Sequence, residues 1–142
     1  MQLQLLYITT QAHDRLIASC REAWPREACG ILTGESDIGK ISDVTAIANV
    51  HSSPATAFAF APDDWVKAYY RMQKSRQSLL GFFHSHPTSH TQPSTADGLG
   101  IHTDDQSLSY WIISLQQPLQ PEIQAYCRMK GGFQPLQWAI AD

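Results

Sequence analysis

Apolar residues recur along the chain with two spacings, one typical of helices and one typical of strands. From Thr10, a predicted cap, to about Pro25, the apolar positions follow the 3.6-residue period of an amphipathic helix. They are Ala12, Leu16, Ile17, Cys20 and Trp24. A second helix is expected to begin at Pro62, with an apolar stripe at Trp65, Ala68, Tyr69 and Met72. Helical spacing favours packing of this stripe into a core over a ligand-binding cluster of aromatic rings.

The other apolar segments are short and separated by turn residues, which predicts strands. The expected strands cover residues 2–8, 29–33, 41–50, 79–83, 110–115, 123–129 and 133–140. The turn-rich connection 34–39 favours a hairpin, so the strands on either side of it should be antiparallel. A short helix is expected from Ser94 to about His102. Together these elements predict an α+β fold with a mixed, largely antiparallel sheet flanked by helices.

Length and charge narrow the classes of protein that the chain can represent. With 142 residues, of which 43% are hydrophobic, residues 1–142 are expected to form a single domain around one core. The formal net charge is −3 and the isoelectric point is about 6.0, and the Lys and Arg residues are scattered along the chain. Nucleic acid is therefore not an expected partner.

The first residues and the cysteines indicate a compartment. Residues 1–6 lack a basic leader, and no run of about 18 apolar residues suggests a membrane helix, so no membrane partner is expected. The three cysteines are Cys20, Cys29 and Cys127, an odd number without a Cys-X-X-Cys pair. This argues against a disulfide framework and against a thiolate zinc site. A cytoplasmic location is expected.

Candidate chemistry is concentrated in the middle of the chain. If the strand before His84 continues, its period of two places His84 and His86 on the same face, where both rings can reach one ion. Pro87 ends the strand, a polar turn follows, and Asp97 can complete the set of ligands. Three protein ligands of this type leave a fourth tetrahedral position for water, as in catalytic zinc sites.

Other interpretations of these residues have to be weighed. Ser94 and Asp97 are also spaced as a helix cap and its third residue, so this part of the pattern could be structural. His90 and His102 are alternative ligands, but neither has a partner at strand spacing. Cys29 could serve as a nucleophile, yet it lies in an apolar strand, where a cysteine is usually an inert small hydrophobe.

The residues of this segment resemble the motif of a known family. The run His84-X-His86-Pro87, six residues, then Ser94-X-X-Asp97 resembles the JAMM motif of the MPN-domain zinc metalloproteases. Upstream, residues 27–34 read Glu-Ala-Cys-Gly-Ile-Leu-Thr-Gly, similar to the segment of that family in which a glutamate precedes a small-residue strand. The resemblance extends over most of the chain and implies the family's cytidine-deaminase-like architecture. The length of the chain is similar to that of the single-domain prokaryotic members of the family.

The resemblance also implies roles for individual residues. Zn²⁺ would be the cofactor, held by His84, His86 and Asp97. Glu27 matches the family's general acid/base, which takes a proton from the metal's water and returns it to the leaving amine. Ser94 matches the serine that donates a hydrogen bond to the oxyanion, a role in competition here with helix capping.

The implied function is that of a zinc-dependent peptidase or isopeptidase. Such enzymes cut the amide bond after the C-terminal Gly-Gly tail of a ubiquitin-like protein or, in prokaryotic members, often of a sulfur-carrier protein. A non-catalytic MPN scaffold and a metal-dependent hydrolase of small amides are the alternatives. The alternation of Ala and Phe over residues 55–60 suggests an exposed strand on which an extended tail could dock. The identity of the carrier and the oligomeric state, with a homodimer among the options, are left open.

Overall fold

The computed structural model describes residues 5–95, 97, 107–129 and 132–142, and its helices lie between strands in the first part of the chain. The helices are α1 (Thr10–Ala23) and α2 (Pro62–Lys74), with a 3-10 turn, η1 (Ser36–Ile38). The strands are β1 (Leu5–Ile8), β2 (Cys29–Glu35), β3 (Lys40–Ile47), β4 (Ser78–His86), β5 (Ser109–Ser114), β6 (Glu122–Met129) and β7 (Gly132–Ile140). The predicted α+β class is confirmed.

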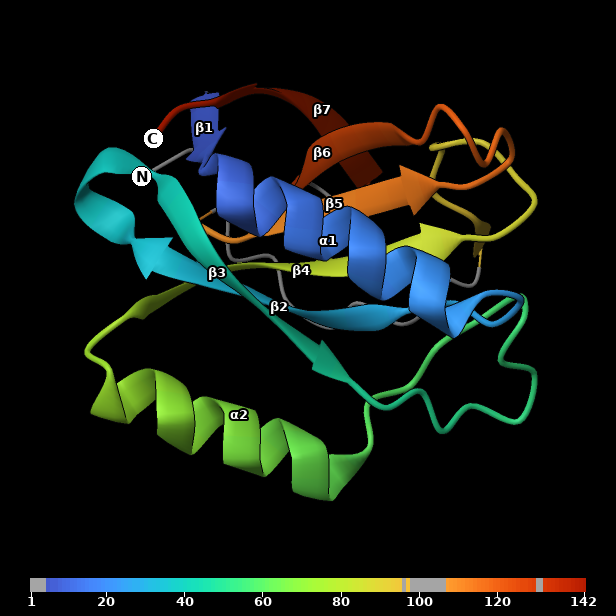
Figure 1. The fold of residues 1–142 in the computed structure, drawn as a ribbon, viewed down its shortest axis with the longest axis horizontal. Coiled ribbons are helices and arrows are strands. Elements are labelled where there is room, and N and C mark those ends of the chain that lie inside the picture. The colour runs from blue at the N-terminus through green and yellow to red at the C-terminus, as the bar shows by residue number, and fades with distance from the viewer. Residues whose placement is uncertain (1–4, 96, 98–106, 130–131) are drawn as a thin grey trace.

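The strands form one mixed sheet that closes on itself, in the order β1-β3-β2-β4-β5-β6-β7 (Figure 1). Strand β1 closes it by pairing in parallel with both β3 and β7. Strands β4 and β5 are also parallel, whereas the remaining four pairings are antiparallel. The mixed sheet was predicted from the sequence, but its closure was not.

Helix α1 packs on the main core through its predicted stripe. Ala12, Leu16 and Cys20 are buried in a cluster with residues of the sheet, among them Phe83 and Trp111. The cap is Thr9 instead of the expected Thr10, because the Thr9 side chain accepts a hydrogen bond from the amide of Ala12 at 3.1 Å. Trp24 was expected on the buried stripe but is 55% exposed, since the helix ends at Ala23 and the chain turns away before Trp24 could reach the core.

Helix α2 covers a second, smaller cluster. Its buried Ala68 packs with Ile31 and Ile47, and the half-buried Trp65 and Phe82 join the same cluster. This confirms the core-packing interpretation for the inner part of the stripe. Among the described residues, no helix has the length and apolar character needed to cross a membrane.

The connection between β3 and α2 differs from the expectation. Strand β3 ends at Ile47, three residues earlier than predicted, and beyond it only Asn49 and Phe60 form an isolated antiparallel bridge. Residues 54–56 form a turn, in which the amides of Thr56 and Ala57 donate to the carbonyl of Ser53. The exposed strand predicted over 55–60 is therefore wrong, because turn hydrogen bonds replace strand pairing in this loop.

Candidate active site

Strand β4 carries two of the predicted site residues. It is longer than expected and runs to His86, so His84 and His86 lie within it and their side chains share one face of the sheet. The other face of β4 carries Phe83, which belongs to the main core. Between the two histidines, Ser85 is hydrogen-bonded to Ala28, which precedes β2. The amide of Ser85 donates to the carbonyl of Ala28 at 3.0 Å, and its Oγ accepts from the amide of Ala28 at 2.8 Å.

The close approach of β2 to β4 depends on a glycine. Gly30 is paired with Phe83 in the register of these strands. A Cβ at Gly30 would overlap the carbonyl oxygen of Thr45 and the ring of Phe83. The absence of a side chain at this position therefore lets β2 lie close to β4, the strand that carries Phe83 and His84.

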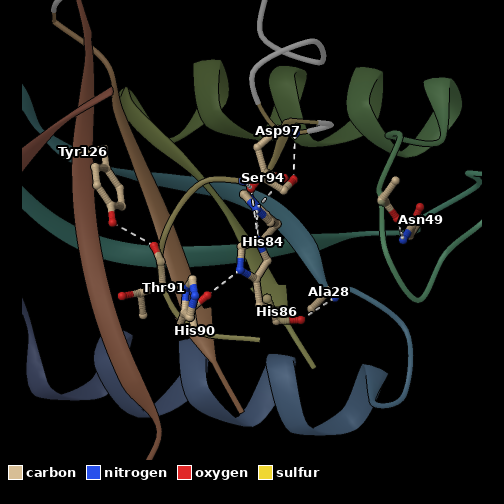
Figure 2. A network of polar contacts seen from close by, with 11 residues as sticks. Ala28, Asn49, His84, His86, His90, Thr91, Ser94, Asp97 and Tyr126 are labelled. Carbon is tan, nitrogen blue, oxygen red and sulfur yellow. Dashed lines mark hydrogen bonds and ion pairs between the residues drawn. The ribbon is translucent and has the colours of Figure 1, made fainter. Parts of the chain in front are cut away.

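The predicted triad meets at the end of β4 (Figure 2). Asp97 Oδ1 lies 3.0 Å from His84 Nε2, and Asp97 Oδ2 lies 3.0 Å from His86 Nε2. The two Nε2 atoms are 3.2 Å apart. All three residues are buried. The structure thus brings together the three residues that the sequence singled out.

The spacing of these donor atoms fits a small metal ion. Ligand atoms at 2.0–2.1 Å from a tetrahedral zinc ion are separated from one another by roughly 3.3 Å. The observed separations of 3.0 to 3.2 Å are close to this value. Two imidazole nitrogens and a carboxylate also form a donor set that zinc prefers. The cluster is therefore a candidate metal site on geometry and on chemistry.

Burial and mutual contacts set the charges of the cluster. Burial lowers the pKa of His84, which favours the neutral imidazole that a metal requires. Burial alone would raise the pKa of Asp97, but its hydrogen bonds with His84 and His86 hold this pKa well below its usual range. Asp97 is therefore a carboxylate at any neutral pH, ready to act as a ligand.

A hydrogen bond behind the cluster orients His86. Its Nδ1 lies 2.7 Å from the carbonyl oxygen of His90, so Nδ1 carries the proton and Nε2 is left facing the other two residues. The loop that presents this carbonyl is anchored to the sheet on both sides. The hydroxyl of Tyr126 donates to the carbonyl of Thr91 at 2.8 Å (Figure 2). The hydroxyl of Ser114 donates to the carbonyl of Ser89 at 2.6 Å.

Glu27 lies beside the cluster, two residues before the start of β2 at Cys29. Its side chain is 3% exposed, and its Oε1 has no hydrogen-bond partner among the described residues. Burial raises the pKa of Glu27 to about 7; the charge of His86 lowers it in part, and that of Asp97 raises it further. Glu27 can therefore exchange a proton near neutral pH, as a general acid/base must. It also lines a cavity of about 180 Å³ between α1 and strands β2 and β3.

Ser94 caps the backbone that carries Asp97. Its Oγ accepts from the amide of Asp97 at 3.0 Å, and its own amide donates to Asp97 Oδ2 at 2.8 Å, a reciprocal cap that also fixes the carboxylate. Of the expected helix over 94–102, Thr95 and Asp97 have helical backbone, and most of the remainder lies outside the described residues. A hydroxyl that accepts one hydrogen bond still has a proton to donate, and Ser94 is exposed. Capping therefore leaves its proton available.

The alternative candidates lie apart from this cluster or are inert. The His90 ring is exposed and, among the residues that the structure describes, accepts from the amide of Gln92 at 3.4 Å, while its carbonyl oxygen accepts from His86. His102 lies outside the described residues. Cys29 is buried, its thiol donates to the carbonyl of Ile47, and burial raises its pKa to about 12, so it is not a nucleophile at neutral pH.

One wall of the site was not predicted from the sequence. The Phe58 ring stacks on the His84 ring, with centroids 4.7 Å apart and an angle of 26° between the planes. Asn49, drawn on a separate loop to one side of the triad in Figure 2, makes hydrogen bonds to the segment that carries Phe58. An isolated asparagine and an aromatic residue in a loop have no periodicity that could have indicated either contact.

Comparison with known proteins agrees with this geometry. A family model described as prokaryotic homologs of the JAB domain matches residues 9–126, and the chain belongs to this family. The family predicted from the sequence is thus confirmed. In the structure, the buried His84, His86 and Asp97 form a His-His-Asp group like that of the JAMM motif.

Curated relatives are known from archaea and bacteria. The desampylase of Haloferax volcanii is 30% identical over 96 residues, which cover 65% of this chain and 69% of that protein. A probable TtuB-protein conjugate cleaving protease of Thermus thermophilus is 36% identical over 77 residues, 54% of this chain and 49% of that protein. The CysO-cysteine peptidase of Mycobacterium tuberculosis is 24% identical over 122 residues, 86% and 82% of the two chains. The expectation that the chain is a hydrolytic enzyme is confirmed.

Solved structures support the fold. The solution structure of a protein from Desulfitobacterium hafniense is similar with a TM-score of 0.86 and 30% identity, over 96% of this chain and 93% of that chain. The crystal structure of a JAB1/MPN domain protein from Archaeoglobus fulgidus is similar with a TM-score of 0.58 and 18% identity, over 94% and 99%. The second likeness concerns the fold alone.

Proposed function

We propose that the chain is a zinc-dependent peptidase or isopeptidase that hydrolyses the amide bond after the C-terminal Gly-Gly tail of a ubiquitin-like or sulfur-carrier protein. The observation that carries this proposal is the convergence of His84 Nε2, His86 Nε2 and the Asp97 carboxylate in one buried cluster. The names of the relatives, a desampylase, a probable TtuB-protein conjugate cleaving protease and a CysO-cysteine peptidase, support the class of partner.

His84, His86 and Asp97 would hold the zinc ion. When bound, zinc supplies Lewis acidity and lowers the pKa of its water towards about 7. The protein contributes the arrangement of the ligands: Asp97 is fixed by the backbone of Ser94, and His86 is fixed by the carbonyl of His90. Because these side chains are held before the metal arrives, little reorganisation is needed for binding.

Glu27 moves the proton in this mechanism. With a pKa of about 7, its carboxylate accepts a proton as the nucleophilic water attacks the substrate carbonyl. The same carboxyl group then delivers that proton to the leaving amine. The unpartnered Oε1 is the atom proposed for this transfer, because no described protein group competes for it.

Ser94 stabilises the oxyanion that forms on the attacked carbonyl. Because its Oγ accepts from the amide of Asp97, its hydroxyl proton can be donated to that oxyanion. We further propose that residues 1–142 form a single cytoplasmic domain whose helices flank the sheet, as in the cytidine-deaminase-like architecture.

Fusions of a ubiquitin-fold carrier to an amine-linked reporter test this function. The zinc-loaded protein should release the reporter from a carrier that ends in Gly-Gly, and a chelator should abolish the release. A matched fusion with Leu at the penultimate position should be cut far more slowly. Equal cleavage of both fusions would favour the hydrolase of small amides, and binding without cleavage of either would favour the non-catalytic scaffold.

A further inference from the structure

Asn49 links the backbone of the loop that follows β3 to the backbone of the candidate acid/base residue. Its Nδ2 donates to the carbonyl of Glu27 and to the carbonyl of Ala57, each at 3.0 Å, with a longer contact of 3.4 Å to the carbonyl of Pro54. Its Oδ1 accepts from the amides of His51 at 3.0 Å and Ala59 at 3.1 Å. One side chain therefore satisfies backbone donors and acceptors from both ends of this loop.

Only an amide side chain of this length offers both the two donor protons and the acceptor oxygen that these contacts use. The two protons of Nδ2 serve the carbonyls of Glu27 and Ala57, and the lone pairs of Oδ1 serve two amides. An aspartate would keep the acceptor side but would place a second oxygen against two carbonyl oxygens. An alanine would leave these partly buried backbone groups without partners, which costs about 1–3 kcal/mol for each group that water cannot reach.

Two backbone hydrogen bonds also attach residues 50–59, here the 50–59 loop. The amide of Val50 donates to the carbonyl of Ala59 at 2.9 Å and closes the base of the loop. The amide of Glu27 donates to the carbonyl of Pro54 at 2.7 Å. Both backbone groups of Glu27 are thus bonded to the 50–59 loop or to its Asn49 anchor, so the positions of the loop and of Glu27 depend on each other.

The 50–59 loop also reaches the candidate metal ligands. Phe58 lies between Ala57 and Ala59, the two loop residues whose backbone groups Asn49 binds directly. Its ring stacks on that of His84 at 4.7 Å and lies 5.9 Å from the ring of Phe60. The Asn49 bonds on either side of Phe58 therefore control how its ring meets a candidate ligand.

We propose that Asn49 is a positioning residue, which holds the 50–59 loop so that Phe58 packs on His84 and Glu27 stays beside the metal cluster. The effect of Asn49 on catalysis rests on the proposed function. Its effect on the position of the 50–59 loop is independent of that function. Asn49 touches neither the candidate ligands nor the reacting atoms, and it acts through Phe58 and Glu27.

The structural consequence is tested on metal-free protein by hydrogen exchange. In wild type the amides of Val50, His51 and Ala59 should be protected. Asn49→Ala and Asn49→Asp should exchange at least about tenfold faster over the 50–59 loop, with β2 and β5 unchanged. Ser52→Ala, an exposed position in the same loop, is the matched control and should behave as wild type. Unchanged exchange over the loop in both Asn49 variants would overturn the proposal.

The second test measures zinc affinity by competition with a chelator, together with kcat and KM on the Gly-Gly fusion. Both Asn49 variants should bind zinc about tenfold more weakly or lose about tenfold in kcat with little change in KM. Phe58→Ala should reproduce the loss in zinc affinity, and the double variant Asn49→Ala/Phe58→Ala should be no worse than the poorer single variant.

The two tests separate failure of this inference from failure of the proposed function. If wild type binds zinc but cuts no fusion, the function is wrong, and the exchange and affinity data still decide the role of Asn49. A loosened 50–59 loop with wild-type zinc affinity and kcat would overturn the positioning role. Strictly additive losses in the double variant would show that Asn49 does not act through Phe58.

Discussion

The two sides of the candidate site are built in different ways. On the strand side, His84 and His86 belong to β4, and their backbone is held by ladders to β2 and β5. On the loop side, Glu27 and Phe58 lie outside regular elements, and a single asparagine side chain ties their backbone together. The two candidate histidine ligands thus take their positions from the sheet, whereas the candidate acid/base residue is held by hydrogen bonds to Asn49 and to the carbonyl of Pro54.

This difference predicts where substitutions do most harm. Loss of a candidate ligand on the strand side should remove the metal and with it the chemistry, while loss of the Glu27 carboxylate on the loop side should leave the metal and impair its use. The predictions below compare the two sides, from the largest expected effect to the smallest.

His86→Ala should lose its zinc and with it turnover, on the order of 10³-fold, because one of three donors is gone. His90→Ala is the matched control: its exposed ring lies outside the cluster, and its carbonyl remains to orient His86. Metal content after dialysis and kcat on the Gly-Gly fusion are the measurements. Equal zinc in both variants would remove His86 from the ligand set.

Glu27→Gln should keep wild-type zinc content and lower kcat by about 10² to 10⁴-fold, because the amide cannot transfer the proton. Glu22→Gln, an exposed change of the same chemistry on α1, should have no effect. Loss of zinc together with activity in Glu27→Gln would make Glu27 a ligand and would contradict the division between the two sides.

The stability of the metal-free protein should depend on pH through Glu27. Because folding raises this pKa from 4.5 to about 7, the stabilisation is present below pH 4.5 and is lost as the pH rises through about 7. Wild type should therefore lose free energy of unfolding relative to Glu27→Gln, by about 1.4 kcal/mol for each unit of pKa shift. Urea unfolding with chelator between about pH 5 and 8 measures this. A difference that does not change with pH would contradict a buried, titrating Glu27.

Tyr126→Phe should weaken zinc binding by about tenfold, because the Thr91 carbonyl loses its donor and the loop that orients His86 is less firmly held. Tyr70→Phe, at an exposed position on α2, is the control for removal of a hydroxyl. The measurement is competition with a chelator. Unchanged affinity in Tyr126→Phe would show that the strand side does not need this anchor.

The same comparison explains what the sequence could predict. His84 and His86 were found because strand periodicity is local, and Asp97 because it follows a cap residue at fixed spacing. Glu27 has no such local pattern and was identified only through the family resemblance. Asn49 and Tyr126 bind backbone carbonyls distant along the chain or across a loop, and such contacts depend on tertiary structure that no single-sequence pattern encodes.

The fold shows the same limit. Most helices and strands were predicted within a few residues, because hydrophobic periodicity and turn residues act locally. The closure of the sheet through β1, which pairs with β3 and β7, was not predicted, because pairing between distant strands leaves no mark on either segment alone. The strand expected over 55–60 failed for a related reason: bonds to the Ser53 carbonyl form a turn, and Asn49 takes backbone groups of Ala57 and Ala59 that a strand would have paired.

A crystal structure of the zinc-loaded protein, with anomalous diffraction recorded at the zinc edge, tests the central claim most directly. We expect one anomalous peak at about 2.0–2.2 Å from His84 Nε2, His86 Nε2 and a carboxylate oxygen of Asp97, with Glu27 beside the ion and outside its bonding distance. A peak elsewhere on the chain, or one bonded to Glu27 or to a cysteine sulfur in place of these residues, would contradict the account.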